Sequence, residues 1–441
     1  MFAQFTVGNF RSIKEPISLS LTATKLKSRY QEINDNNVFT ASKNIDLVKS
    51  AVIYGANASG KSNLIQALSF MRHFVINSSR ESLASDPIEV EPFALGDQWE
   101  NKPSFFEIMF FLNGKLYRYG FEADEHKIYN EWLFQTVRRE SKIFIRESGK
   151  SKIDMTDSFR RTEGRNLDEL TRPNALFLSV LAQWNSTLAQ TILEWFKQIG
   201  IISGIYDIGY KQFTLEQFQK DKLIQQDIIN FMQEMDLDIR DIVATETDIA
   251  EMKLPSKMPE ELQSFLMKNG STLTTIAIFH ERFDDEGESI GHVEFDLDDH
   301  ESAGTQKMFA LSGPLFHTLR NGEVLVIDEL DARLHPLITK SIIQLFNSNK
   351  TNPKNAQLIF ATHDTNHLSN RLFRRDQIWF MEKDKFAATD LYSLSDFKIR
   401  NDASYEADYI AGKYGAIPFV GASQNLIHFD DEVVAHEVMR S

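Results

Sequence analysis

The stretch Ala51–Ser62, AVIYGANASGKS, constrains this chain more than any other. Gly55, Gly60, Lys61 and Ser62 match the pattern G-x-x-x-x-G-K-[ST]. An apolar run that is typical of a buried strand precedes the pattern, and apolar residues at helical spacing follow it. A glycine-rich turn in this context directs backbone N–H groups and the positive end of the helix dipole at an anion. The stretch therefore predicts a phosphate-binding loop.

The side chains of such a loop have expected roles. Lys61 is expected to reach the β- and γ-phosphates of a nucleotide, and Ser62 is expected to hold Mg²⁺. The alternative is a glycine-rich turn that matches by chance, against which the motifs described below argue. The candidate nucleotide-binding residues of the loop are Gly55, Ala56, Asn57, Ala58, Ser59, Gly60, Lys61, Ser62 and Asn63.

Composition limits the classes of function. The chain has 441 residues, of which 42% are hydrophobic, so it can bury a large core and could hold two or three domains. Its formal net charge is −15, whereas a protein that mainly grips DNA is more often basic. DNA contact stays possible, because an acidic total can hide a basic face. The absence of cysteine excludes disulfides and thiolate metal sites.

The N-terminus MFAQFTVGNFRS lacks the charged-then-apolar pattern of a signal peptide. No apolar run approaches the length of a membrane span. We therefore expect a cytoplasmic protein that does not enter a membrane.

The order of patterns along the chain predicts an α/β fold. Residues 1–149 are predicted to form an N-terminal lobe, with a strand pair at 2–24, a polar loop at 25–46, and strands from 91 to 147 that include a hairpin at Asn113-Gly114. A mostly helical insertion is predicted at 150–272. In the lobe predicted at 273–400, helices and buried strands alternate as in a parallel sheet with crossover helices, and 401–441 is predicted to be a tail.

Two acids follow the buried strand pattern at Val324–Ile327. The carboxyl ends of strands in open α/β sheets are where ligands bind. We expect Asp328 to hold Mg²⁺, and Glu329 to orient and deprotonate an attacking water. The alternative is a strand that runs into a solvated acidic turn, which the phosphate-binding loop upstream makes the weaker interpretation.

A second buried strand pattern, Leu358–Thr362, ends in His363. A histidine at this place can reach the γ-phosphate and sense its presence, although a lone histidine is more often a cap or a surface residue. His367 lies four residues further on, a spacing that would suit a metal, but no third ligand stands out. Ser302 and Gly304 open a further predicted helix, where they could bind an anion or simply cap the helix.

Taken together, these motifs resemble those of the ABC-type ATPases of the SMC, RecF and OLD-like group. The matching segments are Asn9-Phe10-Arg11-Ser12 for the N-terminal NFRS motif, Ser302-Ala303-Gly304-Thr305-Gln306 for the ABC signature, Asp328-Glu329 for Walker B, Leu330-Asp331 for the D-loop, Thr362-His363-Asp364 for the switch histidine, and Gly412–Pro418 for a C-terminal motif of the shorter AAA-type members. The helical middle matches no family residue, and no glutamine loop is evident, although Glu91-Pro92-Phe93 lies near its expected place.

The resemblance implies an ABC/SMC-head-like P-loop ATPase fold, with ATP and Mg²⁺ as cofactors. It implies two ATP molecules between two heads, each held by the Walker residues of one chain and by Ser302 and Gly304 of the other, and hence a homodimer or higher homo-oligomer. Arg11 and Asp331 are expected beside the nucleotide, and the alternative for Arg11 is a structural role at the surface.

The role in the cell is open at this point. OLD-family proteins carry a TOPRIM nuclease after the head, and the stretch after Asp364 is shorter than a typical domain of about 100–150 residues. The chain is similar in this respect to the ATPase subunits of PARIS-type anti-phage defence systems. That similarity implies a sensor and scaffold which restrains a separate TOPRIM-type effector nuclease until a phage protein triggers its release. The alternatives are a RecF-like DNA-binding repair ATPase and a structural oligomer that binds nucleotide without turnover.

Overall fold

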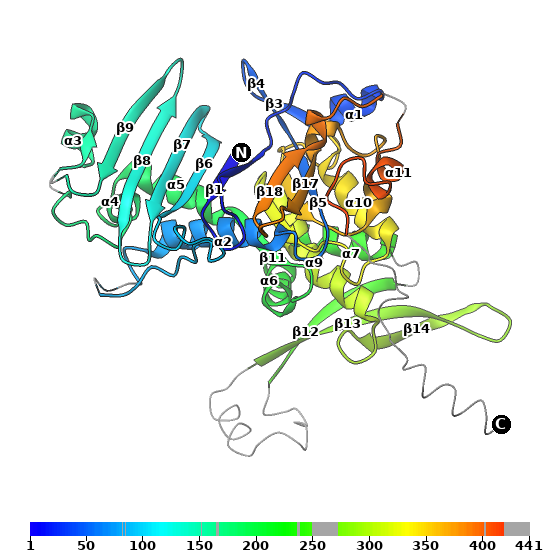
Figure 1. Cartoon of the computed structure of the whole chain (residues 1–441). Coiled ribbons are helices and arrows are strands. Elements are labelled where there is room, and N and C mark those ends of the chain that lie inside the picture. The colour runs from blue at the N-terminus through cyan, green and yellow to red at the C-terminus, as the bar shows by residue number, and fades with distance from the viewer. Residues whose placement is uncertain are drawn as a thin grey trace, which may run out of the picture.

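A computed structural model describes residues 1–81, 83, 85–150, 152–164, 167–235, 239–248, 272–400 and 403–418. Two large sheets stand side by side, and the long helix α2 (Lys61–Asn77) runs beneath them (Figure 1). Apolar side chains of both sheets and of α2 form one continuous hydrophobic core.

The central sheet has six strands in the order β11-β15-β16-β5-β17-β18. The first five are parallel, and β18 pairs antiparallel with β17. Their bounds are β11 Ile199–Ser203, β15 Val324–Asp328, β16 Gln357–Ala361, β5 Ser50–Tyr54, β17 Ile378–Lys383 and β18 Thr389–Ser393. The strand and helix alternation predicted beyond residue 273 is confirmed from Val324 to Lys383.

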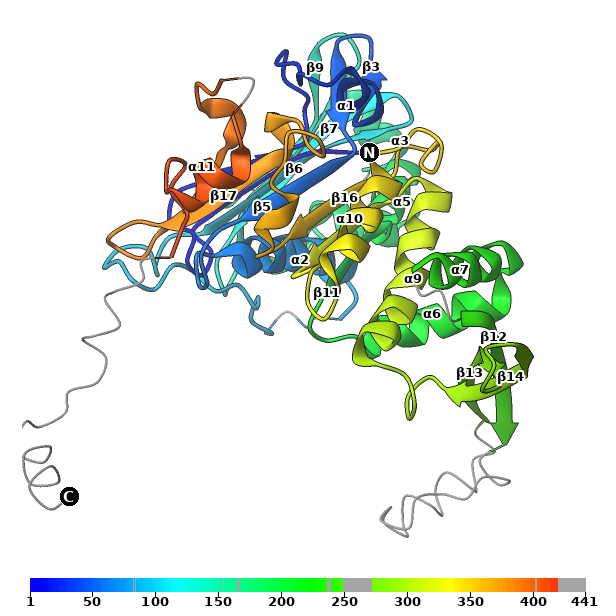
Figure 2. The ribbon, with the colours of Figure 1, turned by 90° about the vertical axis from the view of Figure 1, so that its right-hand side faces the viewer.

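Both faces of the central sheet are covered. Ala51 and Ile53 of β5 belong to the core shared with α2, whereas Val52 and Tyr54 belong to a second core on the opposite face. That second core contains side chains of α9 (Ala303–Asn321) and α10 (Pro336–Phe346), which Figure 2 shows beside the sheet. Burial on both faces explains why these strands are continuously apolar and do not alternate.

The other large sheet is antiparallel, with seven strands in the order β10-β9-β8-β7-β6-β1-β2. Their bounds are β1 Phe2–Gly8, β2 Ile17–Ser20, β6 Ser104–Leu112, β7 Lys115–Ala123, β8 Ile128–Thr136, β9 Glu140–Glu147 and β10 Asp154–Met155. Asn113 and Gly114 join β6 to β7 with φ values of 50° and 73°. Positive φ at both central residues is the signature of a type I′ hairpin, so this predicted hairpin is confirmed.

The prediction of a polar loop over 25–46 is wrong. The segment contains α1 (Gln31–Asn36) and β3 (Val38–Ser42), and β4 (Ile45–Val48) begins in it. Strands β3 and β4 pair with each other, and they bury Phe39, Leu47 and Val48. The remaining side chains of this small hairpin are mostly polar and at least partly exposed, which is why its composition resembles that of a loop.

In the first part of 150–272, where a mostly helical insertion is predicted, the structure contains helices and also a strand of the central sheet. Helix α3 spans Asp157–Thr162, while α4 (Phe177–Gln183) and α5 (Thr187–Lys197) pack against α2. β11 then pairs in parallel with β15 at the edge of the central sheet. The chain up to Ser203 therefore belongs to the two-sheet body.

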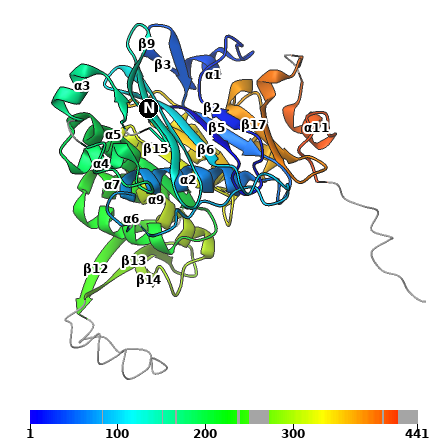
Figure 3. The same cartoon turned by 60° about the vertical axis from the view of Figure 1, so that its left-hand side comes forward.

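The remainder of that stretch combines helices with a small sheet. Helices α6 (Ile208–Lys220) and α7 (Lys222–Met235) pack against α9. Strands β12 (Ile239–Asp248), β13 (Thr272–Phe283) and β14 (Ser289–Asp296) form an antiparallel sheet that projects from the body below α6 (Figure 3). Residues 249–271 lie outside the described residues.

The predicted tail begins as an ordered part of the body. α11 (Tyr405–Ile410) packs its Tyr409 ring against Tyr54 of β5 and against Phe380 of β17. Residues 419–441 lie outside the described residues. Within the described chain, no helix combines the length and the apolar character needed to cross a membrane.

Candidate functional site

The predicted phosphate-binding loop connects β5 to α2, between the end of a buried strand and the start of a helix. Ala58 and Gly60 have φ values of 61° and 115°, which turn the backbone sharply before the helix begins. Gly60 is the N-cap of α2, and no side chain caps that end of the helix. The first N–H groups of α2 are therefore available for an anion.

A network of side-chain hydrogen bonds holds this loop in place. Thr389 of β18 donates its hydroxyl to the Ser59 carbonyl oxygen at 2.9 Å, and its Oγ1 lies 2.8 Å from Ser12 Oγ. Asn63 in turn donates to Ser12 Oγ at 2.6 Å. A Cβ on Gly60 would overlap Thr389 Oγ1. The close approach of Thr389 and the left-handed backbone at residue 60 therefore both require glycine there.

Lys61 is only 6% exposed and curls back over the loop. Its Nζ donates to the carbonyl oxygens of Gly55 and Ala56 at 2.8 and 3.1 Å. Burial lowers the pKa of Lys61, and the carboxylates of Asp328 and Glu329 oppose that shift. The ammonium group thus lies in the curve of the loop, close to the two acids.

Asp328 ends β15, and Glu329 follows it in the left-handed region with φ 58°. Asp328 Oδ1 is buried and has no hydrogen-bond partner among the described residues. An unpartnered carboxylate oxygen close to a lysine and to a serine-terminated phosphate loop suits a magnesium ion bound with substrate phosphates. The residues present, Ser62 and Asp328, therefore fit the predicted Mg²⁺ site.

His363 follows β16 and faces the same region. Burial lowers its pKa, and the nearby Lys61 ammonium lowers it further, so the imidazole is neutral at pH 7. A pocket of about 500 Å³ is lined by residues 57–63 together with Glu329, His363 and Lys383. His367 is buried instead, with Nε2 3.1 Å from Asp364 Oδ2, and it does not line this pocket.

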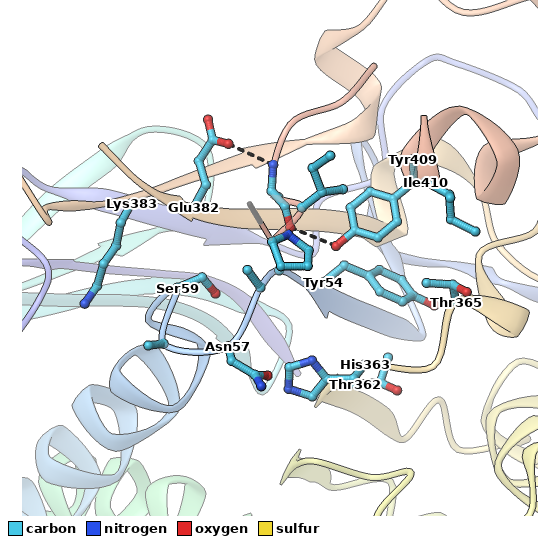
Figure 4. Close-up of a pocket in the computed structure, with 16 residues that line it drawn as sticks. Tyr54, Asn57, Ser59, Thr362, His363, Thr365, Glu382, Lys383, Tyr409 and Ile410 are labelled. Carbon is cyan, nitrogen blue, oxygen red and sulfur yellow. Dashed lines mark hydrogen bonds between the residues drawn. The ribbon is translucent and has the colours of Figure 1, made fainter. Parts of the chain in front are cut away.

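A second pocket of about 770 Å³ lies on the other side of the loop. Figure 4 shows Asn57 and His363 on one side of it, with Tyr409 and Ile410 on the other. The C-terminal motif forms part of its wall, where the Tyr409 hydroxyl donates to the carbonyl oxygen of Ala416 at 2.9 Å and the Ala416 N–H donates to Glu382 at 2.8 Å. The motif thus supports the loop region from the carboxyl end of the chain.

Five predicted site residues line neither pocket, namely Arg11, Ser302, Gly304, Asp328 and Asp331. Arg11 donates hydrogen bonds to Glu91 at 2.7 Å and to Gln66, and its guanidinium group lies over the ring of Phe10. Ser302 caps α9 by accepting the Thr305 N–H at 3.1 Å, as the alternative interpretation expected, and Gly304 lies in the first turn of that helix. The structure of one chain therefore brings Lys61, Glu329 and His363 to one pocket, and the signature residues Ser302 and Gly304 do not line it.

Asp331 lies near the acids without lining either pocket. Its charge acts on Lys61 and His363, and its Oδ1 is buried without a hydrogen-bond partner among the described residues. Glu91, beside the expected place of a glutamine loop, is engaged by Arg11.

Lys383 and Thr389 were missed from the sequence. Lys383 ends the parallel strand β17 and lines both pockets, and the rule that found Asp328 and His363, a polar residue at the carboxyl end of a buried strand, would have found it too. Thr389 carried no such signal, because its role depends on a contact with Ser12 at the opposite end of the chain.

Comparisons with known proteins find remote similarities to solved structures and one family model. Among solved structures, the chain is similar to the SMC head domain from Thermotoga maritima, with 11% identity over 90% of this chain and 99% of that one and a TM-score of 0.39. It is also similar to the SmcHead bound to the C-winged helix domain of ScpA, with 12% identity, 89% and 97% coverage and a TM-score of 0.43. It is similar as well to the recombination mediator protein RecF with ATP, with 14% identity over 89% of this chain and 97% of that one and a TM-score of 0.30. No curated protein matches the chain in sequence.

A family model described as "AAA domain, putative AbiEii toxin, Type IV TA system" matches residues 50–369. This range begins with β5 and contains the phosphate loop, the signature, both Walker acids and His363. The α/β P-loop ATPase fold predicted from the sequence is thereby confirmed. Since the match covers more than half of the chain, the protein belongs to this AAA-domain family of P-loop ATPases.

Proposed function

We propose that this chain hydrolyses ATP with Mg²⁺ and that two copies close around two nucleotides. The observation that carries the proposal is the division of the motifs. Lys61, Glu329 and His363 line one pocket, while Ser302 and the first turn of α9 lie outside it. A helix N-terminus that does not line the nucleotide pocket of its own chain can bind a phosphate held by a second copy.

The residues of one pocket divide the chemistry among them. Lys61 and the N-terminal turn of α2 bind the phosphates, and Ser62 and Asp328 hold Mg²⁺, which when bound neutralises charge on the phosphate oxygens. Glu329 accepts a proton from the attacking water, and the neutral His363 hydrogen-bonds to the γ-phosphate. The signature of the second copy binds the γ-phosphate only while that phosphate is present, so hydrolysis releases the pair.

Substitutions in the two half-sites test this arrangement. Lys61→Ala should abolish nucleotide binding, because it removes a charge from within the chain's own pocket. Ser302→Ala should leave ATP binding to a single chain unchanged, and should weaken both hydrolysis and ATP-dependent association by about tenfold or more. Thr156→Ala is the matched control, because Thr156 caps α3 in the same way that Ser302 caps α9, away from both pockets.

Binding is measured with a fluorescent ATP analogue, turnover by phosphate release, and association by sedimentation. If Ser302→Ala lowered ATP binding to the single chain as strongly as Lys61→Ala, each site would be complete within one chain. The proposed sandwich, in which two copies enclose two nucleotides, would then be refuted. Glu329→Gln should keep ATP binding and lower turnover by about 100-fold or more. Unchanged turnover would refute the catalytic role of Glu329.

We further propose that this ATPase is the sensor and scaffold of a bacterial anti-phage system, and that it controls a separate effector nuclease in response to a phage trigger. The family description, which names a putative toxin and a type IV TA system, supports a role in a two-component system. The net charge of −15 suits a protein partner better than a DNA clamp.

Co-purification with the product of the adjacent gene tests the role in defence. We expect a stable complex that ATP or Glu329→Gln strengthens and that a phage lysate dissociates. Failure to bind any adjacent gene product would contradict it. Salt-sensitive DNA binding that stimulates hydrolysis would instead favour the RecF-like repair ATPase.

A further inference from the structure

Gly204 lies between the Walker B acids and the signature helix. It follows β11, and its N–H donates to the Asp328 carbonyl oxygen at 2.5 Å. A Cβ on Gly204 would overlap the carbonyl oxygen of Glu329, so only glycine permits this approach. The backbone that carries the two acids therefore rests directly on residue 204.

The other side of Gly204 is held by Lys307 of α9. The Lys307 side chain is fully buried, and its Nζ donates to the Gly204 carbonyl oxygen and to the Tyr210 hydroxyl of α6. Burial lowers the pKa of Lys307 to about 8, while Asp207 raises that pKa and Arg333 lowers it. Burying an ammonium group is costly unless it is well hydrogen-bonded, and an apolar side chain would fill this place without that cost.

The turn that follows β15 is strained at two points. Glu329 and Arg333 adopt φ values of 58° and 64°, in the left-handed region that non-glycine residues rarely occupy. Arg333 NH1 also lies 3.7 Å from Asp207 Oδ2, so a second contact joins this turn to the segment after Gly204. Strained backbone persists where surrounding contacts hold it, and such positions cluster at functional sites.

We propose that Lys307 is a positioning residue that ties the signature helix to Glu329 of the same chain through Gly204. The inference rests on the proposed function. In the sandwich, the nucleotide that contacts Ser302 is held by the partner copy, whereas Glu329 acts on the nucleotide in the chain's own pocket. Lys307 lies only five residues after Ser302 on α9, so binding at one site sets the position of the catalytic acid at the other.

This connection predicts positive cooperativity between the two sites. In the wild-type chain, hydrolysis should rise with ATP concentration with a Hill coefficient near the number of sites, about 2. Lys307→Met keeps the apolar length of the side chain and removes both hydrogen bonds. We expect ATP binding to the single chain to stay within about twofold, kcat to fall by about tenfold or more, and the Hill coefficient to approach about 1.

Lys49→Met is the matched control. Lys49 is also fully buried, burial also lowers its pKa to about 8, and its Nζ donates to Asn349 at 2.6 Å. It precedes β5, at the amino-terminal end of that strand, whereas the Walker acids lie at the carboxyl end of β15. Lys49→Met should therefore lower the melting temperature by a similar amount and leave both kcat and the Hill coefficient unchanged.

Tyr210→Phe provides a milder test should Lys307→Met fold poorly. It removes one of the two acceptors of Lys307, leaves the bond to Gly204, and should give an intermediate loss of cooperativity. If folded Lys307→Met or Tyr210→Phe kept the wild-type kcat and Hill coefficient, the role of Lys307 would be overturned and the ATPase proposal would stand. If the wild-type chain did not hydrolyse ATP, both proposals would fall.

Discussion

The hydroxyl of Thr389 offers the sharpest test of how the phosphate loop is held. Thr389→Val preserves the shape of the side chain and removes its oxygen. The Ser59 carbonyl oxygen and the Ser12 hydroxyl then each lose one partner inside the protein. A buried polar group left unpaired costs about 1–3 kcal/mol. Since Ser12 keeps its bond from Asn63, only the Ser59 carbonyl oxygen in the loop is left unpaired, and the total should be about 1–3 kcal/mol.

That cost appears in nucleotide affinity as well as in stability. If the loop leaves its binding conformation more often, the apparent dissociation constant rises in proportion, by tenfold for each 1.4 kcal/mol. We therefore expect Thr389→Val to bind ATP about 10- to 100-fold more weakly and to melt at a lower temperature. A fluorescent-nucleotide titration and a thermal unfolding curve measure the two effects.

Thr339→Val is the control for this experiment. Thr339 is also fully buried, on α10, but its hydroxyl has no hydrogen-bond partner among the described residues. The same substitution there removes no hydrogen bond and should leave both affinity and melting temperature unchanged or slightly raised. If Thr389→Val bound ATP within twofold of the wild type and had the same melting temperature, the hydrogen bonds of Thr389 would not be what holds the loop.

Two further predictions concern buried ionisable groups. Glu131 of β8 accepts the Phe177 and Leu178 N–H groups of α4 at 2.6 and 2.9 Å and is fully buried, so Glu131→Ala should lower the free energy of unfolding in urea by about 3–5 kcal/mol, and Glu131→Gln by less. The pKa of His363 is lowered from 6.5 in the folded chain, so the unfolded chain takes up the proton first and stability should fall as pH drops below 6.5. His363→Asn should flatten that part of the stability profile, and an unaltered profile would contradict the shift.

Local patterns predicted the parts of the site that follow from one segment alone. The phosphate loop could be located because its strand, its glycines and its helix are contiguous in sequence. Asp328 and His363 could be located because each lies at the carboxyl end of a buried strand. Asn113-Gly114 fixed the β6–β7 hairpin for the same reason, since the turn type depends on two adjacent residues.

Elements that depend on distant partners were missed. β11 is a five-residue apolar run directly after α5, and such a run cannot be distinguished from a helix end by periodicity. It becomes a strand because β15, more than a hundred residues further on, offers it an open edge. In the same way, the hairpin formed by β3 and β4 has few buried side chains and gave no apolar alternation strong enough to outweigh its polar composition.

The contacts missed from the sequence also say how the two halves of the site relate. The signature residues do not line the pocket of their own chain, yet Gly204 and Lys307 join α9 to the backbone of the Walker acids. Each half-site is thus chemically incomplete alone and mechanically tied to the other half of the same chain. In the proposed dimer, two such chains complete both sites only together, and we expect binding at one site to affect the other. That combination is what a switch needs if it is to close only when both nucleotides are present.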